Sequence, residues 1–480
     1  MYRIEQAAPS PQLLWREAWC LYTPIMSTGG GNGAARVGPQ RQLTLFDSTC
    51  IIVGIIIGVG IYEASPLIAR CVPGPLTLLG VWVLGGVLSL VGALCYAELA
   101  TAYPEEGGDY VYLTRAFGRP LGFMFAWAQL WVVRPGSIGA MAYVFARYAN
   151  RLWPIGGPPL ALMTYALAAI VVLSVINVLG VRAGKTTQNL LATVKVLGLA
   201  AIVVVGLLFA RSGASPVAVA DASEGGIRLA MIMILFTYGG WNEMAYVGAE
   251  VRDPRRNILR ALVLGTVAVT LIYVLVNVAF VHALGFEGTR QSGAVAADVL
   301  ALGLADWGAR GISVLVCISA LGAINGQIFT GARIYYAMGA DHRLYARLGR
   351  WNPTLGTPVW SLALQAAVTA ALVVAFGFTA GGFESMVKFT TPVFWLFLFL
   401  VGASLFVLRV RQPDVARPYR VPWYPLIPVA FCLSSLFMVY SSISYAIENR
   451  TYEALWSMAI LVAGVVLACF VGKARPEGNG

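Results

Sequence analysis

Charged side chains are scarce in this chain. Only 11% of its 480 residues are Asp, Glu, Lys or Arg, while 59% are hydrophobic. Ordinary soluble domains are about a quarter charged. A soluble core cannot hide this much apolar surface, so the composition excludes a soluble globular protein and indicates a polytopic membrane protein. The net charge of +11 does not indicate nucleic-acid binding, because the basic residues stand in short loops between apolar runs.

The residues and motifs of common catalytic sites are also missing. Histidine occurs only twice, and no P-loop, HExxH or GxSxG motif is present. The seven cysteines include no CxxC pair, which excludes a disulfide framework or a zinc site. We therefore predict that the protein is not an enzyme, that it needs no cofactor or metal, and that it has no domain for ATP use.

What the chain does have is a series of apolar runs of membrane length. The runs lie near residues 46–70, 76–103, 121–149, 159–180, 187–210, 228–249, 258–284, 309–338, 357–378, 384–408, 424–446 and 453–472. They predict an all-α membrane protein with about twelve transmembrane helices. Lys and Arg gather in alternate loops, which predicts that both termini are cytoplasmic.

The first 44 residues are mostly polar and rich in Gly, Ser and Pro. We expect them to form a disordered cytoplasmic N-terminal tail, followed by a transporter domain over residues 45–472 and a short cytoplasmic C-terminal tail over residues 473–480.

Two of the apolar runs are interrupted by glycine-rich backbone. The first contains Gly58-Val59-Gly60, and the sixth contains Gly239-Gly240. A bilayer core offers no water to free backbone groups, so a spanning helix breaks only where something else satisfies them. Half-helix N-termini suit an anionic group, and freed carbonyls suit a cation. The two breaks therefore predict a secondary transporter for a small zwitterion.

The breaks stand in the first and sixth spans. If five spans form one repeat, the second copy enters from the opposite side, because five is odd. We therefore predict a five-plus-five inverted repeat, with repeat one at about 46–210 and repeat two at about 228–408, and with helices 11 and 12 at about 424–472 outside it.

Several short motifs occur in a fixed order along the chain. They are Gly58–Tyr62 with Ser65-Pro66, Cys95–Leu99 through Pro104–Tyr110, Val133–Ser137, Phe236–Asn242 running into Glu250–Pro254, and Pro418–Pro422. Together they resemble the amino acid–polyamine–organocation superfamily, and most closely its L-type amino acid transporter branch, over residues 45–470. The resemblance implies a twelve-helix inverted-repeat fold and amino acid transport or exchange.

The same resemblance implies a substrate site at the breaks. Backbone N–H groups of Gly58, Val59 and Gly60 would bind the carboxylate of an amino acid. The family more often has Gly-Ser-Gly here, so Val59 removes a hydroxyl and leaves only the backbone bonds. The carbonyls of Ile56, Phe236, Thr237 and Gly239 would receive the ammonium group. Phe236 also matches the family's gating aromatic side chain.

Lys195 lies in the middle of the fifth apolar run. A central lysine costs about 2.5–3.5 kcal/mol on insertion scales, so it should face protein or water. The matching lysine of several family members stands where sodium-coupled relatives hold sodium. We predict a coupling role for Lys195, either as a fixed ammonium that bonds helix 1 carbonyls and makes sodium unnecessary, or as the carrier of a coupling proton.

Other polar residues within the apolar runs give weaker signals. Glu63 is a candidate for selecting cationic substrates, although a carboxylate in the vestibule that is solvated or paired with an arginine is the stronger interpretation. Glu243 has the same ambiguity, and Asn325 lies in the span beside the sodium-type position. Arg134 is expected to bond the backbone or a carboxylate of helix 3.

The sequence thus predicts sodium-independent transport of amino acids by alternating access across the plasma (inner) membrane. Exchange and proton symport remain open, and Thr237, Val59 and Phe236 weakly favour a neutral substrate. A polyamine or other organocation carrier is the alternative, and an ion channel is a weaker one. No heavy-chain partner is expected, because the outer loop Asn150–Pro159 has no cysteine to attach one.

Overall fold

The structure is a computed structural model. It describes residues 38–157, 159–209, 226–304, 306–378, 382–448 and 452–471. The predicted C-terminal tail and residues 1–37 of the predicted N-terminal tail lie outside these ranges. The described residues are almost entirely helical, with three isolated β-bridges and no β-strand among them. The prediction of an all-α membrane protein is confirmed.

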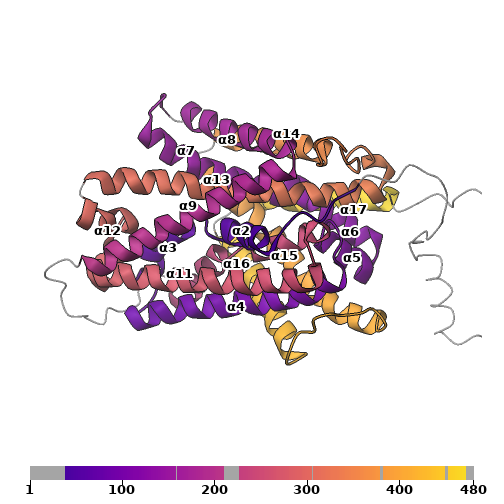
Figure 1. Cartoon of the computed structure of the whole chain (residues 1–480), viewed down its shortest axis with the longest axis horizontal. Helices are drawn as coiled ribbons and strands as arrows, with labels where there is room; N and C mark the ends of the chain where they lie inside the picture. Colours follow the sequence, from indigo (N-terminus) through magenta and orange to yellow (C-terminus); the bar gives the residue numbers. More distant parts are fainter. Residues whose placement is uncertain are drawn as a thin grey trace, which may run out of the picture. The chain divides into compact units, whose positions relative to one another are not determined.

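Every predicted span coincides with helical structure (Figure 1). Spans one to five are α2 (Leu45–Ile56) with α3 (Gly60–Arg70), α4 (Pro75–Ala102), α6 (Arg119–Ala128) with α7 (Arg134–Leu152), α8 (Leu160–Val178) and α9 (Val181–Leu208). Spans six to twelve are α10 (Gly226–Thr237) with the 3-10 helices η2 (Trp241–Tyr246) and η3 (Gly248–Glu250), α11 (Pro254–Gln291), α13 (Asp306–Asp341), α14 (Val359–Gly377), α15 (Gly382–Arg411), α16 (Leu426–Glu448) and α17 (Tyr452–Val471).

Not every span is one continuous helix. Within the described ranges, 8 helices are long and apolar enough to cross a membrane alone, and the pair α2 and α3, bent by 47°, counts as one more. The third and sixth spans are assembled from shorter pieces, and the helix of the twelfth is shorter. Short helices in the connections are α5 (Asp109–Phe117), α12 (Val295–Leu304) and η4 (Arg343–Tyr345).

Equivalent helices of the two predicted repeats pack against each other. The second spans pair as α4 with α11, the third as α7 with α13, and the fourth as α8 with α14. In Figure 1, α4 and α11 run side by side, as do α8 and α14. The fifth span of each repeat packs on the third span of the other repeat, since α9 contacts α13 and α15 contacts α7. This reciprocal pairing is what an inverted repeat predicts.

The third span widens into a π-helix (η1) at Gln129–Val133, just before Arg134 and Pro135. Proline has no N–H, and its ring crowds the carbonyl four residues earlier. A π-turn can accommodate such a missing hydrogen bond, and π-turns often occur at functional sites. Here it turns Arg134 into the interior, where the side chain is almost fully buried.

The end of the bundle at which α2 begins, here called the N-terminal face, is held together by backbone contacts. The N–H groups of Gln42 and Leu43 both donate to the carbonyl of Glu250, and Arg252 N donates to Leu43 O. Residues 38–44 therefore belong to the folded bundle, which differs from the tail boundary predicted at residue 44. Glu106 forms an antiparallel bridge with Val247 at the same face.

Candidate functional site

A cavity of the described bundle lies between the two breaks. It encloses about 1020 Å³ of space between atoms, including its open mouth. Its walls come from α2 and α3, η1 and α7, α10 and η2, α13 and α15. All seven predicted substrate residues line it, namely Ile56, Gly58, Val59, Gly60, Phe236, Thr237 and Gly239. The structure thus brings the predicted substrate residues into one site.

The first break covers residues 57–59. Ile57 leaves the helical conformation at ψ 79°, and Gly58 N donates to Ile56 O at 2.7 Å. The N–H groups of Tyr62 and Glu63 donate to Val59 O. This leaves Gly60 and Ile61 as the first-turn N–H groups of α3, which have no acceptor within the helix. The break therefore presents a positive helix end beside the cavity. The predicted carboxylate bond from Gly58 N–H is wrong for this structure, because that N–H already donates to Ile56 O.

The second break covers residues 238–240 and has a different form. Gly239 N donates to Phe236 O at 3.1 Å, and Gly240 is left-handed at φ +111°. After this turn the chain continues as 3-10 helix rather than α-helix. Gly240 must be glycine on two grounds: its φ disfavours other residues, and a Cβ there would lie 2.6 Å from Cγ2 of Ile55.

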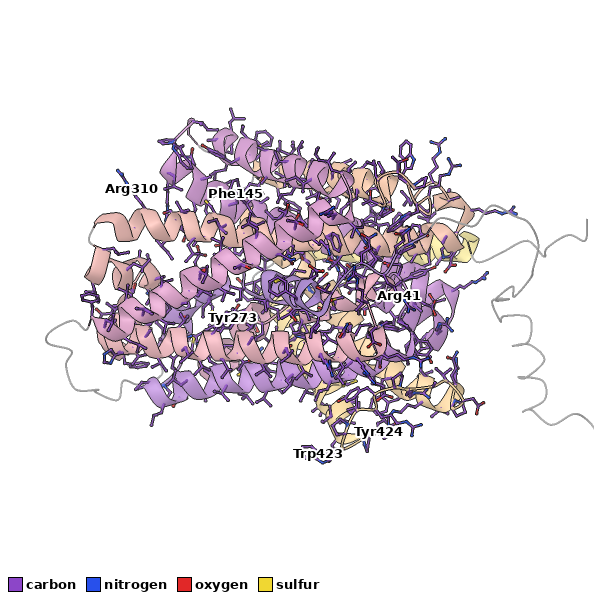
Figure 2. The ribbon with its side chains drawn as sticks, in the orientation of Figure 1. Arg41, Phe145, Tyr273, Arg310, Trp423 and Tyr424 are labelled. Atoms are coloured by element: carbon purple, nitrogen blue, oxygen red, sulfur yellow. The ribbon has the colours of Figure 1, made fainter. Side chains whose placement is uncertain are left out.

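The two breaks are in direct contact. A Cβ on Gly60 would lie 2.7 Å from Oγ1 of Thr237, so only glycine allows this approach. The buried Tyr273 of α11, labelled in Figure 2, donates its hydroxyl to Ile56 O at 2.9 Å and approaches Thr237 O at 3.4 Å. Ile56 O therefore already has two donors, Gly58 N and Tyr273, which differs from its predicted bond to the substrate ammonium.

Lys195 lies beside the first break and is fully buried. Its Nζ donates to Gly54 O at 2.7 Å, Ile57 O at 2.8 Å and Ser319 O at 3.0 Å. The Ser319 hydroxyl in turn bonds Ile57 O and Gly58 O. Gly322 makes room for the lysine, since a Cβ there would lie 2.8 Å from Nζ. Three carbonyls match the three donors of a charged ammonium group.

Arg134 and Glu243 form a buried ion pair in the cavity wall. Arg134 Nη1 lies 2.7 Å from Glu243 Oε2, which also accepts the Thr330 hydroxyl at 2.6 Å. The guanidinium donates to Gln129 Oε1 at 3.2 Å and lies 4.8 Å from the ring centre of Tyr246. The expectation that Arg134 bonds the backbone or a carboxylate of helix 3 is wrong, because its partner within that span is the side-chain amide of Gln129. Its carboxylate partner comes from η2, because the second break brings Glu243 against the third span.

The N-terminal face is sealed by further charged contacts below this cavity. Arg333 Nε bonds Glu250 Oε1 at 2.7 Å, and both side chains are buried. Arg409 binds both oxygens of Glu98 at 2.8 and 2.6 Å. Buried ion pairs of this kind lock packed elements together, because separating them leaves an unpaired charge in a dry site.

Asp109, at the start of α5, supports the inner end of the second break. Its Oδ2 accepts the hydroxyls of Tyr246 at 2.7 Å and Tyr96 at 2.9 Å. Burial raises the pKa of Asp109 to about 7, against the lowering effect of these two hydrogen bonds. Tyr246 itself lines the cavity, so a titratable carboxyl group lies one hydrogen bond away from it.

The remaining predicted site residues differ in their surroundings. Glu63 lies outside the cavity lining, where it accepts Tyr148 Oη at 3.0 Å and faces Arg147 at 3.5 Å. Of the solvated and arginine-paired arrangements that the sequence left open for Glu63, this is the arginine-paired one. Asn325 also lies outside it and bonds Asn177, Gly184 O and Gln188 between α8 and α9. Phe236 lines the cavity with 42% of its surface exposed.

Sequence reasoning missed two residues that organise the site. Tyr273 joins the two breaks, and Ser319 completes the carbonyl cluster around Lys195. Each is an ordinary residue within an apolar run, and its importance comes from a partner more than 200 residues away. A polar side chain in a buried span was the only available signal.

Comparison with known proteins gives a consistent result. Residues 43–466 match the amino acid permease family. Over 436 residues the chain is 31% identical to b(0,+)-type amino acid transporter 1 of Mus musculus, covering 89% of this chain and 87% of the relative. It is 30% identical over 454 residues to large neutral amino acids transporter small subunit 2 of Homo sapiens, covering 92% and 81%.

Proposed function

The chain belongs to the amino acid permease family, within the amino acid–polyamine–organocation superfamily, and transports amino acids across a membrane; we propose that it does so by sodium-independent exchange through alternating access. The cavity between the two breaks supports this proposal best. It is lined by an unpaired helix start on one side and by turn carbonyls on the other, which suits the two charged ends of a zwitterion.

The substrate carboxylate would accept hydrogen bonds from the N–H groups of Gly60 and Ile61 at the start of α3. Gly58 and Val59 would lie next to it. Val59 is buried and apolar, so recognition there relies on backbone alone. The ammonium would bond the carbonyls of Thr237 and Gly239, with Phe236 O as a further acceptor because it has only one donor, Gly239 N.

Lys195 would replace a coupling ion. Its Nζ lies among carbonyl oxygens of the kind that bind sodium, and it has no carboxylate partner among the described residues. A neutral amine has only two N–H donors, so three carbonyl acceptors favour the permanently charged form. A lysine that stays charged does not release and rebind a proton during transport. This favours exchange over proton symport.

The structure resembles a carrier that is closed at one face. The N-terminal face holds the buried Arg333–Glu250 pair and the partly buried Arg409–Glu98 pair, whereas Phe236 is partly exposed at the cavity. The excess of Lys and Arg in alternate loops favours a cytoplasmic N-terminal face. We therefore assign this conformation as open toward the outside, with Phe236 as the side chain that closes over bound substrate.

The proposed setting is the plasma (inner) membrane, with both termini in the cytoplasm. The small-subunit relative is named as one part of a larger transporter. In this chain the loop Asn150–Pro159 contains no cysteine for a covalent partner, and we propose that it works without a heavy chain.

Counterflow in proteoliposomes tests the exchange proposal. Vesicles loaded with unlabelled amino acid and placed in sodium-free buffer should take up labelled amino acid transiently, and polyamines should not compete. Uptake that needs sodium, or that does not depend on internal amino acid, would contradict exchange.

Phe236→Ala is expected to leave the protein folded and substrate binding measurable, while counterflow falls about tenfold, because the cavity no longer closes over the substrate. Thermal stabilisation by substrate provides the binding control. A normal counterflow rate in the purified variant would remove Phe236 from the gate.

A further inference from the structure

Two charged and two carboxamide side chains reach the cavity. They are Gln129, Arg134, Glu243 and Gln327, here called the polar wall, and hydroxyl groups of Ser137, Thr390 and Thr391 also line the cavity. The other side chains that reach the cavity are mostly apolar, including Val133, Met141, Leu235, Met386, Val387, Phe394 and Trp395. In an apolar pocket, a few convergent polar groups fix the orientation and identity of the ligand.

The two charges of the polar wall neutralise each other. Arg134 Nη1 and Glu243 Oε2 lie 2.7 Å apart, and Thr330 and Gln129 bond the pair from either side. A cationic substrate side chain would be attracted by Glu243 and repelled by Arg134, and an anionic one the reverse. Entry of either would leave one uncompensated charge in a nearly dry site. The wall therefore disfavours both kinds of charged side chain.

Gln327 adds an unpaired acceptor to this wall. Its Oε1 is buried and has no hydrogen-bond partner in the described structure, although the residue lines the cavity. Buried polar groups are normally paired, so an unpaired one in a ligand cavity points to a donor on the ligand. A neutral N–H or O–H group on the substrate side chain would supply that donor.

The polar wall stands within reach of a substrate held at the breaks. Glu243 follows Gly240 by three residues in the 3-10 helix η2. At about 2 Å per residue, Glu243 lies about 6 Å along the chain from the second break. A substrate side chain must therefore extend several bonds beyond its Cα atom to meet the wall, as a glutamine side chain does. A shorter side chain would leave the wall unused.

We infer that this site selects amino acids whose neutral side chain ends in a carboxamide, with glutamine as the best fit. The amide nitrogen donates to Gln327 Oε1 and Glu243, and the amide oxygen accepts from Arg134. The inference rests on the proposed function, because it requires an amino acid whose charged ends sit at the two breaks.

Glutamine and methionine provide a matched test, because their side chains are of similar length and differ at the polar end. Counterflow in sodium-free proteoliposomes should give a kcat/KM for glutamine at least tenfold above that for methionine, lysine or glutamate. If wild-type vesicles exchange no amino acid, the proposed function fails. If they exchange methionine or lysine as well as glutamine, only the present inference fails.

The double variant Arg134→Met/Glu243→Met makes the wall apolar without leaving a single buried charge, a replacement that folded proteins tolerate. It should reverse the preference, with methionine at least tenfold above glutamine. The pair of the half-buried Arg290 and the exposed Glu287 on α11 lies outside the cavity lining, so Glu287→Met/Arg290→Met is the matched control and should keep the wild-type preference.

Gln327→Met removes the unpaired acceptor and leaves the ion pair intact. It keeps the inference testable even if the double variant does not fold. Its preference for glutamine over methionine should fall severalfold. An unchanged preference in Gln327→Met, or glutamine selectivity that persists in a folded double variant, would overturn the assignment.

Discussion

The two breaks satisfy their freed backbone groups in different ways. At the first break, α-helix continues on both sides, and the freed carbonyls of Gly54 and Ile57 are bonded by Lys195 from another helix. At the second break, the inner half is 3-10 helix, and the turn satisfies itself through Gly239 N to Phe236 O and Glu243 N to Gly240 O.

This difference shows where each break takes its stability. The first depends on a charge supplied by α9, so its shape is tied to the packing of α2, α9 and α13. The second depends on a backbone conformation that only glycine adopts easily. We infer that the first break is the fixed reference of the site, and that the second, with fewer outside bonds, is the part that rearranges during transport.

Removing the hydrogen bonds that Lys195 makes to the first break should have the largest effect on counterflow. Lys195→Met removes three hydrogen bonds to buried carbonyls, although Ile57 O keeps the Ser319 hydroxyl, and bonds to a charged group are worth about 1.5–3 kcal/mol each. We expect counterflow to fall at least 100-fold. Lys388→Met, which breaks only a partly exposed pair with Glu384, is the control. If Lys195→Met transports as well as the control, the first break does not depend on the ammonium.

Alanine substitutions separate a steric requirement from a backbone requirement. Gly60→Ala should reduce counterflow severely because its Cβ meets Thr237, and Gly60→Ala/Thr237→Ala should restore most of it because the obstructing atoms are gone. Gly240→Ala should not be rescued by Ile55→Ala, since φ +111° itself strains alanine by about 1–3 kcal/mol. Equal rescue at both breaks would remove the distinction between them.

The bond that joins the breaks should have a smaller effect. Tyr273→Phe loses one buried hydroxyl bond to Ile56 O and keeps the ring packing. A typical hydrogen bond contributes about 0.5–1.5 kcal/mol, so counterflow should fall about two- to tenfold. The rate is compared with that of Tyr440→Phe, an exposed tyrosine on α16. No change would show that the breaks are held together by packing alone.

The smallest effect is expected at Asp109, which supports the second break from below. The pKa of this carboxyl rises from 3.8 to about 7 on folding. Its contribution to stability is therefore full below pH 4 and is lost as the pH rises through about 7. The melting temperature should fall between pH 5 and pH 8, and Asp109→Asn should flatten that slope. A steeper slope in the variant would reverse the assigned sign.

The sequence predictions that succeeded rested on single residues that are unusual within an apolar run. Both breaks were visible as glycines inside apolar runs, and Lys195 as a charge inside one, because such residues are costly in a membrane unless the fold uses them. These signals also marked the elements of the inverted repeat. They mark a position along the chain and do not identify what it contacts.

What the sequence could not show depends on contacts between distant spans. The partner of Arg134 is Glu243, 109 residues away, and it arrives through a turn whose 3-10 continuation no apolar pattern reveals. Asn325 was placed near the sodium-type position, but it bonds α8 and α9 instead, and Ser319 on the same helix contacts the first break. Six residues along α13, which is less than two helical turns, separate these two environments.

The most direct test of the account is a sodium titration of counterflow in the wild-type protein. With Lys195 bonded to the carbonyls of the first break, exchange should proceed at the same rate from sodium-free buffer up to physiological sodium. An exchange rate that rises severalfold with sodium would contradict the claim that the Lys195 ammonium occupies the place of the ion.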